Sequence, residues 1–379
     1  MGNVPELRFP EFSGEWEEVK LGDITTFFDS RRIPLKESER VAGEYPYYGA
    51  SGIIDYVNDY IFDGEYILLG EDGANIIMRN SRLVFLAKGK FWVNNHAHIF
   101  QTNGSNYFLC EALERINFLK YNTGTAQPKL NADIVKKIKI YLPPLPEQQK
   151  IADFLTAIDE KITILTDKIT QLKTYKRGMM QKLLSGELRF PGFKDAWREV
   201  RLGETGTIIT GSTPPTKDSE NYGDDYLWVT PTDIRETKIV YSTNKKLSMV
   251  GAEKARMIPK NSLLVTCIAS IGKNVILKEK GSCNQQINAI TPNGNFDVDF
   301  LYYIIENNVN KLLAYAGGGS MLILNKKDFS SIKFEFPPFP EQQKIADFLT
   351  AIDDKLTIEQ EKLDQLKLYK QGLLQKMFI

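Results

Sequence analysis

The sequence has few of the residues that carry redox or metal chemistry. Its 379 residues include only two histidines and three cysteines, Cys110, Cys267 and Cys283. An odd number of widely spaced cysteines, without a Cys-x-x-Cys pair, predicts neither a disulfide framework nor a structural zinc site. We therefore expect the chain to bind no metal and no cofactor of its own.

Long apolar runs and a net charge are also absent. The longest apolar runs, such as residues 262–268, are far shorter than the roughly 18 residues of a membrane-spanning helix. Residues 1–10 lack the apolar core of a signal peptide, so we expect a cytoplasmic protein. Because 48 Lys and Arg balance 48 Asp and Glu, an anionic partner would have to meet local basic patches.

What the sequence does contain is an internal repeat. Residues 146–159 read PEQQKIADFLTAID, and the same fourteen residues return at 340–353, 194 positions later. A second set of matches has an offset of 181: Leu7-Arg8-Phe9-Pro10, Phe12, Trp16 and Leu21-Gly22 recur as Leu188-Arg189-Phe190-Pro191, Phe193, Trp197 and Leu202-Gly203. The repeating unit is therefore a variable domain followed by a helix-like segment.

The repeat predicts four segments in a circular order. The first domain spans 1–142, its helix 143–187, the second domain 188–336 and its helix 337–379. The Leu-Arg-Phe-Pro segment follows the first helix at Leu188 but opens the chain at Leu7. We therefore predict that the two ends of the chain meet and that the halves are related by a pseudo-two-fold axis.

The repeated helices carry apolar residues at the alternating spacing of a coiled-coil seam. The predicted seam residues are Ile151, Leu155, Ile158, Ile162, Ile169 and Leu172 in the first helix, and Ile345, Leu349, Ile352, Leu356, Leu363 and Leu366 in the second. Lys176, Glu359 and Lys370 interrupt the pattern. We predict that the two helices pack as an antiparallel coiled coil, starting near Pro146 and Pro340. A dimerising coiled coil in any oligomeric protein would show the same seam.

The variable segments predict an α+β fold, because short β-branched and aromatic runs alternate with Gly/Asn/Asp turns and brief helices such as 108–118 and 300–313. Clusters of amide and histidine side chains could read base edges, or could equally cap turns at strand ends. They are Asn94, Asn95 and His96, and Asn284, Gln285 and Gln286. The candidates for phosphate contacts, or for solvated surface charges, are Arg31, Arg32, Lys36, Lys129, Lys245, Lys246, Lys326 and Lys327.

Catalytic motifs are missing. The Pro-Pro pairs at 143–144 and 337–338 resemble a methyltransferase motif, but Leu142 and Phe336 stand where that motif needs a hydrogen-bonding residue. No phosphate-binding loop surrounds Gly272-Lys273-Asn274, and Glu18-Val19-Lys20 lacks the upstream partner of a nuclease site. We expect a non-catalytic chain.

Two variable domains separated by repeated Pro-Pro-x-Pro-Glu-Gln-Gln-Lys-Ile-Ala helices, with Trp16 recurring as Trp197, resemble the specificity subunit of a Type I restriction-modification system. The resemblance covers the whole chain. It implies a non-catalytic subunit whose two target-recognition domains each read one half of an asymmetric, bipartite site on double-stranded DNA. It also implies assembly with two methyltransferase subunits and two restriction-translocase subunits, which would hold S-adenosylmethionine, ATP and Mg²⁺.

The helices would then set the unread spacer and dock the methyltransferase subunits. A helix of about forty residues is roughly 60 Å long, and domains one DNA turn apart would leave a spacer of about five to eight base pairs. Identity at the two helix starts goes beyond what a seam requires, so we predict docking residues there: Glu147, Gln148, Gln149, Lys150, Glu341, Gln342, Gln343 and Lys344. The alternative is an orphan coiled-coil scaffold without DNA specificity.

Overall fold

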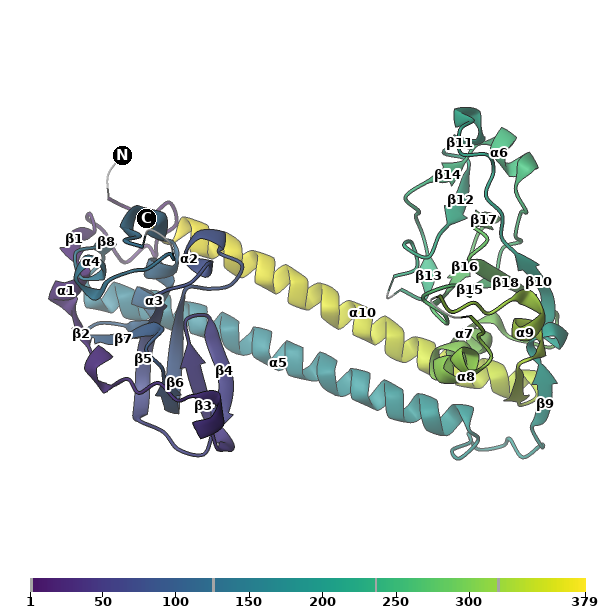
Figure 1. Cartoon of the computed structure of the whole chain (residues 1–379), viewed down its shortest axis with the longest axis horizontal. Helices are drawn as coiled ribbons and strands as arrows, with labels where there is room; N and C mark the ends of the chain where they lie inside the picture. Colours follow the sequence, from purple (N-terminus) through teal and green to yellow (C-terminus); the bar gives the residue numbers. More distant parts are fainter. Residues whose placement is uncertain (1–2, 125–126, 236, 319–320) are drawn as a thin grey trace. The chain divides into compact units, whose positions relative to one another are not determined.

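The computed structural model describes residues 3–124, 127–235, 237–318 and 321–379, and it divides the chain into two compact units (Figure 1). The first unit combines Met1–Thr166 with Glu361–Ile379, and the second is Asp167–Gln360. Each unit contains one mixed domain and parts of both long helices, α5 (Leu145–Leu184) and α10 (Phe339–Lys376). The predicted α+β class is confirmed.

The domain of the first unit is built on a six-stranded sheet in the order β2-β7-β5-β6-β3-β4. Its strands are β2 (Thr25–Phe27), β3 (Ala42–Gly49), β4 (Gly52–Val57), β5 (Phe62–Gly70), β6 (Val84–Val93) and β7 (Ala97–Thr102). Around it lie α1 (Leu21–Ile24), α2 (Asn75–Met78), α3 (Asn106–Glu114), α4 (Ala132–Val135), the 3-10 turns η1 (Asp29–Arg31), η2 (Glu37–Glu39) and η3 (Phe118–Tyr121), and a strand pair of β1 (Glu17–Lys20) with β8 (Lys139–Leu142).

Strand β5 shows why this sheet has a core on each face. Successive side chains of a strand point to opposite faces. Ile67 and Leu69 join a cluster that includes Leu109 of α3, whereas Tyr66 and Leu68 join a separate aromatic-rich cluster with Phe91. The sheet is therefore buried on both sides along the second half of β5, which explains why residues 66–69 are a continuous apolar run rather than an alternating one.

The domain of the second unit has a five-stranded sheet, β10-β18-β15-β16-β13, and a four-stranded sheet, β11-β14-β12-β17. The strands are β10 (Gly206–Thr210), β11 (Tyr222–Gly223), β12 (Tyr226–Val229), β13 (Ile239–Val240), β14 (Lys246–Leu247), β15 (Ser262–Thr266), β16 (Asn274–Leu277), β17 (Ser282–Cys283) and β18 (Ile287–Pro292). The remaining elements are β9 (Arg198–Arg201) paired with β19 (Lys333–Phe336), α6 (Met249–Lys254), α7 (Val298–Asn307), α8 (Val309–Ala314), α9 (Lys326–Ser331), and the 3-10 turns η4 (Leu202–Glu204) and η5 (Ser219–Asn221).

The two domains share one strand framework although their sequences differ. Phe27 of β2 lies opposite Phe100 of β7, and 181 residues later Ile208 of β10 lies opposite Ile290 of β18. The parallel pairing of β3 with β6 likewise has its counterpart in the pairing of β12 with β17. The framework therefore provides a position-by-position alignment of the two domains.

The long helices run in opposite directions within each unit. In the first unit, Ile151 and Leu155 near the start of α5 share a buried cluster with Leu373 and Met377 near the end of α10. In the second unit, Leu183 near the end of α5 clusters with Ile345 and Leu349 near the start of α10. All twelve predicted seam residues are buried or half-buried. The antiparallel pairing is confirmed, and the helices begin at Leu145 and Phe339.

The ends of the chain meet in the first unit, where Figure 1 marks both termini. The Leu7 N–H donates to the carbonyl of Lys376 at 2.8 Å, and Trp16 packs in the cluster that contains Phe378. In the second unit the Leu188 N–H donates to the Lys182 carbonyl at 3.1 Å, but there the chain is continuous. The predicted circular order is confirmed. Within the described residues, no helix combines the length and the hydropathy that crossing a bilayer requires.

Candidate nucleic-acid interface

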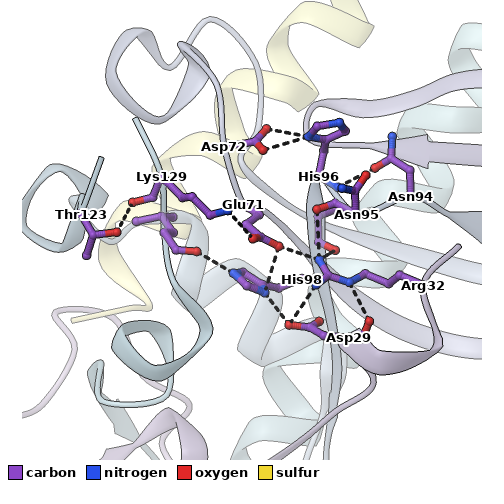
Figure 2. Close-up of polar contacts among 12 residues, drawn as sticks. Asp29, Arg32, Glu71, Asp72, Asn94, Asn95, His96, His98, Thr123 and Lys129 are labelled. Atoms are coloured by element: carbon purple, nitrogen blue, oxygen red, sulfur yellow. Dashed lines mark hydrogen bonds and ion pairs between the residues drawn. The ribbon is translucent and has the colours of Figure 1, made fainter. Parts of the chain in front are cut away.

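Four loops of the first domain come together at one edge of the sheet, here called the first loop edge (Figure 2). They follow β2 (29–36) and β5 (71–73), join β6 to β7 (94–96), and precede α4 (122–124 and 127–131). The Glu71 N–H donates to the His96 carbonyl at 2.8 Å, and the Leu130 N–H donates to the Glu71 carbonyl at 2.7 Å. These bonds hold three of the loops side by side.

The second domain has the same backbone frame, here called the second loop edge. The Cys267 N–H donates to the Gln286 carbonyl at 2.8 Å, and the Leu324 N–H donates to the Cys267 carbonyl at 2.8 Å. Cys267 therefore occupies the position of Glu71, and Gln286 that of His96. This edge is formed by the loops after β10 (211–215), after β15 (267–272), between β17 and β18 (284–286) and before α9 (317–318 and 321–325).

Asn94 and Asn284 are turn residues. The Asn94 Oδ1 accepts the N–H of His96 at 2.8 Å, and the Asn284 Oδ1 accepts the N–H of Gln286 at 3.1 Å. Both asparagines are buried, and each backbone N–H is bonded to the neighbouring parallel strand at 3.0 Å. An asparagine that bonds the backbone two residues on is typical of a tight turn. The base-reading interpretation of Asn94 is therefore wrong, and the turn-capping alternative is correct.

The exposed tips of these turns differ between the domains. Asn95 and His96 are exposed in the first, and His96 Nδ1 lies 2.9 Å from a carboxylate oxygen of Asp72. In the second, Gln285 is exposed and accepts the hydroxyl of Thr213 at 2.5 Å, while half-buried Gln286 accepts the amide of Asn284 at 2.9 Å. The side chains that remain available to a ligand are thus an amide and an imidazole on one edge and two amides on the other.

Arg32 is committed inside the first domain. Its guanidinium pairs with Glu71 at 2.7 Å and donates to the Ala97 carbonyl at 2.8 Å, and its side chain is only 13% exposed. The phosphate-contact interpretation of Arg32 is therefore wrong, because its charge already has a half-buried partner. At the aligned position the second domain has Thr213.

A buried histidine network lies beside Arg32, and sequence reasoning did not find it (Figure 2). His98 Nδ1 lies 2.6 Å from Asp29 Oδ2, and its Nε2 lies 2.7 Å from the Leu130 carbonyl. Burial alone would raise the pKa of Asp29, but the His98 hydrogen bond and the nearby positive charges outweigh it, so that pKa lies below its usual value. The pKa of Glu71 is also lowered, because Arg32 and His98 outweigh its burial.

The second loop edge has uncharged side chains at the matching positions. The hydroxyl of Thr210 donates to Asn288 at 2.7 Å, where the first domain has Asp29 and His98. An isolated bridge pairs Ile268 with Ile323, where the first domain pairs Asp72 with Lys129. In the sequence, only the spacing of the repeat indicates which residues of the two domains correspond. These residues can be aligned one by one only when the strand registers are known.

The remaining basic candidates differ in their surroundings. Lys129 is exposed at the first loop edge and pairs with Glu71 at 3.2 Å, whereas exposed Arg31 lies 4.7 Å from the ring of Phe62. Lys36 is exposed, and Lys326 and Lys327 are exposed in the first turn of α9, beside the second loop edge. Lys245 and Lys246 line a separate open pocket of about 390 Å³ with Tyr222. No group of His, Cys, Asp and Glu among the described residues is arranged to hold a metal ion.

Four of the predicted docking residues are buried, so their side chains are not part of the outer surface of the helices. Glu147 and Glu341 are fully buried, and each accepts two hydrogen bonds of 2.7–2.9 Å from Arg8 or Arg189. Gln148 bonds the Pro143 carbonyl at 2.9 Å and the Ser105 N–H, and Gln342 bonds the Pro337 carbonyl and the Asp297 N–H in the same way. These side chains join the helix starts to their own domains. Gln149, Lys150, Gln343 and Lys344 are exposed.

The sequence matches the family described as Type I restriction modification DNA specificity domain twice, over residues 13–174 and 194–368. A type I restriction enzyme specificity subunit of Methanocaldococcus jannaschii is 26% identical over 405 aligned positions, which cover 97% of this chain and 92% of that protein.

Solved structures share the fold. The Type-I restriction-modification S subunit from M. genitalium matches with a TM-score of 0.70 and 17% identity over 99% of both chains. A chain from a structural study of assembly and conformational transition in the type I R-M system matches with a TM-score of 0.55 and 19% identity, over 96% of this chain and 97% of that one. Because the two family segments together cover most of the sequence, the chain belongs to the family of type I restriction-modification DNA specificity proteins.

Proposed function

We propose that the chain is the DNA-reading subunit of a Type I restriction-modification complex, and that each domain reads one half of an asymmetric bipartite target. The observation that carries this proposal is the pair of loop edges. They share a backbone frame, bond for bond, but that frame carries different residues: Glu71, Asp72 and Lys129 in the first domain correspond to Cys267, Ile268 and Ile323 in the second. A common frame with different side chains suits two related readers of different sequences.

The exposed side chains of the loop edges are chemically suited to DNA. Amide side chains such as those of Asn95, Gln285 and Gln286 can pair with adenine through two hydrogen bonds in the major groove. The ammonium groups of Lys129, Lys326 and Lys327 can contact phosphates, which fix the position of a protein on the duplex without reading its sequence. Under this proposal the loop edges face the DNA.

The outer faces of the long helices would dock two methyltransferase subunits. Ile164 and Ile358 are 65% and 51% exposed, and Tyr175 and Tyr369 are 50% and 55% exposed. Each pair is separated by the repeat distance of 194 residues, so each unit offers one of these isoleucines and one of these tyrosines. Exposed apolar residues that recur in both units are typical of an interaction surface rather than of a solvated face.

Catalysis would belong to the partners of this chain. S-adenosylmethionine would be bound by the methyltransferase subunits, and ATP and Mg²⁺ by two restriction subunits, in the stoichiometry that the family resemblance implies. The purified chain alone is then expected to transfer no methyl groups and to hydrolyse no ATP.

A domain exchange tests the proposed function. Residues 193–336 are replaced by the matching segment of a relative, the variant is co-expressed with the methyltransferase subunit, and the methylated motif is read by methylome sequencing. We expect one half of the motif to change and the other to persist. A change in both halves would contradict separate reading. Failure of the unmodified chain to co-purify with the methyltransferase subunit would instead favour an orphan coiled-coil scaffold.

A further inference from the structure

Two of the polar residues that interrupt the helix seam make the same contact in the two units. In the first unit the ammonium of Lys370, from α10, lies 2.6 Å from Asp159 Oδ1 of α5. The hydroxyl of Tyr107, from α3, donates to Asp159 Oδ2 at 2.5 Å. The Lys370 ammonium also lies 5.8 Å from the centre of the Tyr107 ring. Three segments that are distant in sequence thus meet at one carboxylate.

The second unit repeats this arrangement with the helices exchanged. Lys176 of α5 lies 2.9 Å from Asp353 Oδ1 of α10, and the hydroxyl of Tyr303, from α7, donates to Asp353 Oδ2 at 2.6 Å. Lys176 and Lys370 are 14% and 13% exposed. We call each tyrosine–aspartate–lysine group a clamp. Each clamp joins a domain to the helix that carries the aspartate and to the opposite helix that carries the lysine.

The two tyrosines reach the aspartates from different turns of their helices. Helices α3 and α7 start at equivalent points, since Ser105 and Asp297 cap them and receive the same contact from Gln148 and Gln342. Tyr107 lies two residues after its cap, whereas Tyr303 lies six residues after its cap. Because the two tyrosines occupy non-equivalent helix positions, duplication of one tyrosine in the repeat does not explain why both bond an aspartate. What the two units share is the contact with the aspartate, not the position of the tyrosine.

Charged residues in a coiled-coil seam cost stability, but they restrict the register in which the helices can pair. A slip of one turn would move the lysine ammonium away from the aspartate of its clamp, and a largely buried charge that loses its partner is costly. The Lys176 ammonium has a second carboxylate partner, Glu306 of α7, at 3.3 Å, so the loss should be largest for Lys370. The tyrosine belongs to the domain, so its hydrogen bond to the aspartate also fixes the position of the domain along the helix pair. Burial and the neighbouring aspartate both raise the pKa of each tyrosine, so the hydroxyl remains a donor.

We propose that Lys176 and Lys370 are positioning residues that fix the register of each recognition domain on the helix pair, and thereby fix the number of unread base pairs accepted between the half-sites. This inference rests on the proposed function. None of the clamp residues belongs to the two loop edges, so we expect the clamps to act on spacing and not on the identity of the bases that are read.

The test uses the complex of the full chain with its methyltransferase subunit. Duplexes carry the same two half-sites, separated by the spacer found in the wild-type methylome or by one or two base pairs more or fewer. The measured quantity is the rate of methyl transfer on each duplex divided by the rate on the best one. Lys370→Met keeps the length of the side chain and removes its charge, Lys370→Arg restores the charge, and Lys376→Met is the control on an exposed lysine of the same helix.

We expect Lys370→Met to reduce the preference for the native spacer by about tenfold, in line with couplings inside charged networks. Lys370→Arg and the Lys376→Met control should keep the preference. The variant should fold, because Asp159 is 37% exposed and keeps its hydrogen bond from Tyr107 when the lysine charge is removed.

A loss of rate by the same factor on every duplex would overturn the proposal, because it would show that the lysine only stabilises the fold. If Lys370→Met is inactive on every duplex, the milder Tyr107→Phe variant is measured on the same set, and the same two outcomes decide. A wild-type complex with no dependence on the spacer would overturn the proposed function itself, together with the clamp.

Discussion

Arg8 and Arg189 explain, at the level of single residues, why two separate repeated motifs occur in this chain. Each arginine comes from a Leu-Arg-Phe-Pro segment, and its partner is the glutamate of a Pro-Glu-Gln-Gln helix start. Both glutamates are fully buried, and their carboxylates are held by paired, charge-assisted hydrogen bonds. The identity of these residues in the two copies therefore has an intramolecular reason and requires no partner protein.

Arg8→Ala should destabilise the first unit by about 3–5 kcal/mol, because it leaves the Glu147 carboxylate buried without its partner. The free energy of unfolding of the full chain in urea measures this change. Lys150→Ala is the matched control, since the exposed Lys150–Glu11 pair at 3.5 Å should contribute at most about 1 kcal/mol. Equal effects of the two variants would contradict the importance assigned to the buried pair.

The carboxylates beneath the first loop edge predict acid sensitivity. The pKa values of Asp29 and Glu71 are lowered from the usual 3.8 and 4.5, so the folded state binds their protons less readily than the unfolded state does. Their contribution to stability is therefore complete above these usual values and is lost as the pH falls below them. In the second unit, burial raises the pKa of Glu306, so that group should oppose the acid-induced loss.

Glu71→Gln tests this pH dependence. The variant should be less stable than the wild type at pH 7, because Arg32 loses its charged partner, but its stability should fall less between pH 6 and pH 3.5. Urea unfolding at a series of pH values, followed by tryptophan fluorescence, to which Trp16 and Trp92 of the first unit contribute, provides the comparison. Parallel pH profiles for the two proteins would show that Glu71 is not among the groups responsible.

At the scale of the helices and strands, the sequence predicted the features that follow from a periodic pattern. It did not predict contacts between residues that are distant in the chain. The helix starts, the seam and the antiparallel pairing follow from a repeated 4-3 spacing, which is a local signal over many residues. The partner of Arg32 is 39 residues away, and the turn role of Asn94 depends on the strand beside it. No local sequence pattern distinguishes a basic residue that pairs with a distant carboxylate from one that is free to bind a phosphate.

The exposed apolar residues of the long helices provide a prediction for docking. Ile164→Asp and Ile358→Asp should each leave the fold intact, because these side chains are mostly exposed. Together they should weaken assembly with the methyltransferase subunit by at least about 2 kcal/mol, which is the usual threshold for a residue that dominates an interface. Co-purification and a binding titration measure the loss. Thr174→Asp on α5 is the control, since it is exposed but does not recur in α10. Unchanged affinity of the double variant would exclude this surface.

At the scale of the whole molecule, each compact unit takes its parts from both ends of the helical repeat. The first unit needs the start of α5 and the end of α10, and the second needs the end of α5 and the start of α10. The four segments predicted from the sequence are consecutive along the chain. The compact units instead combine segments that pack together, and each unit contains part of both helices. Lengthening one helix alone would therefore disturb the pairing in both units.

Lengthening both helices together tests whether they set the spacer. Four residues inserted after Gln171 and four after the matching Gln365 add about one turn, or roughly 6 Å, to each helix. At roughly 3.4 Å per base-pair step, we expect the methylated motif to keep both halves and to gain one or two unread base pairs. Four residues inserted after Gly192, in the exposed linker, serve as the control. An active variant with the original spacer would refute the role of the helices as a ruler.

The placement of residues 361–379 in the first unit has a consequence for biosynthesis. The sheet of the first domain leaves the ribosome early, but the apolar face formed by Trp16, Phe108 and Leu155 is covered by Leu373, Met377 and Phe378. Until these three residues are translated, the nascent chain carries that face uncovered, while all segments of the second unit have already been made. A stop codon between residues 361 and 373 would therefore damage the domain encoded first, and the domain encoded second would be spared.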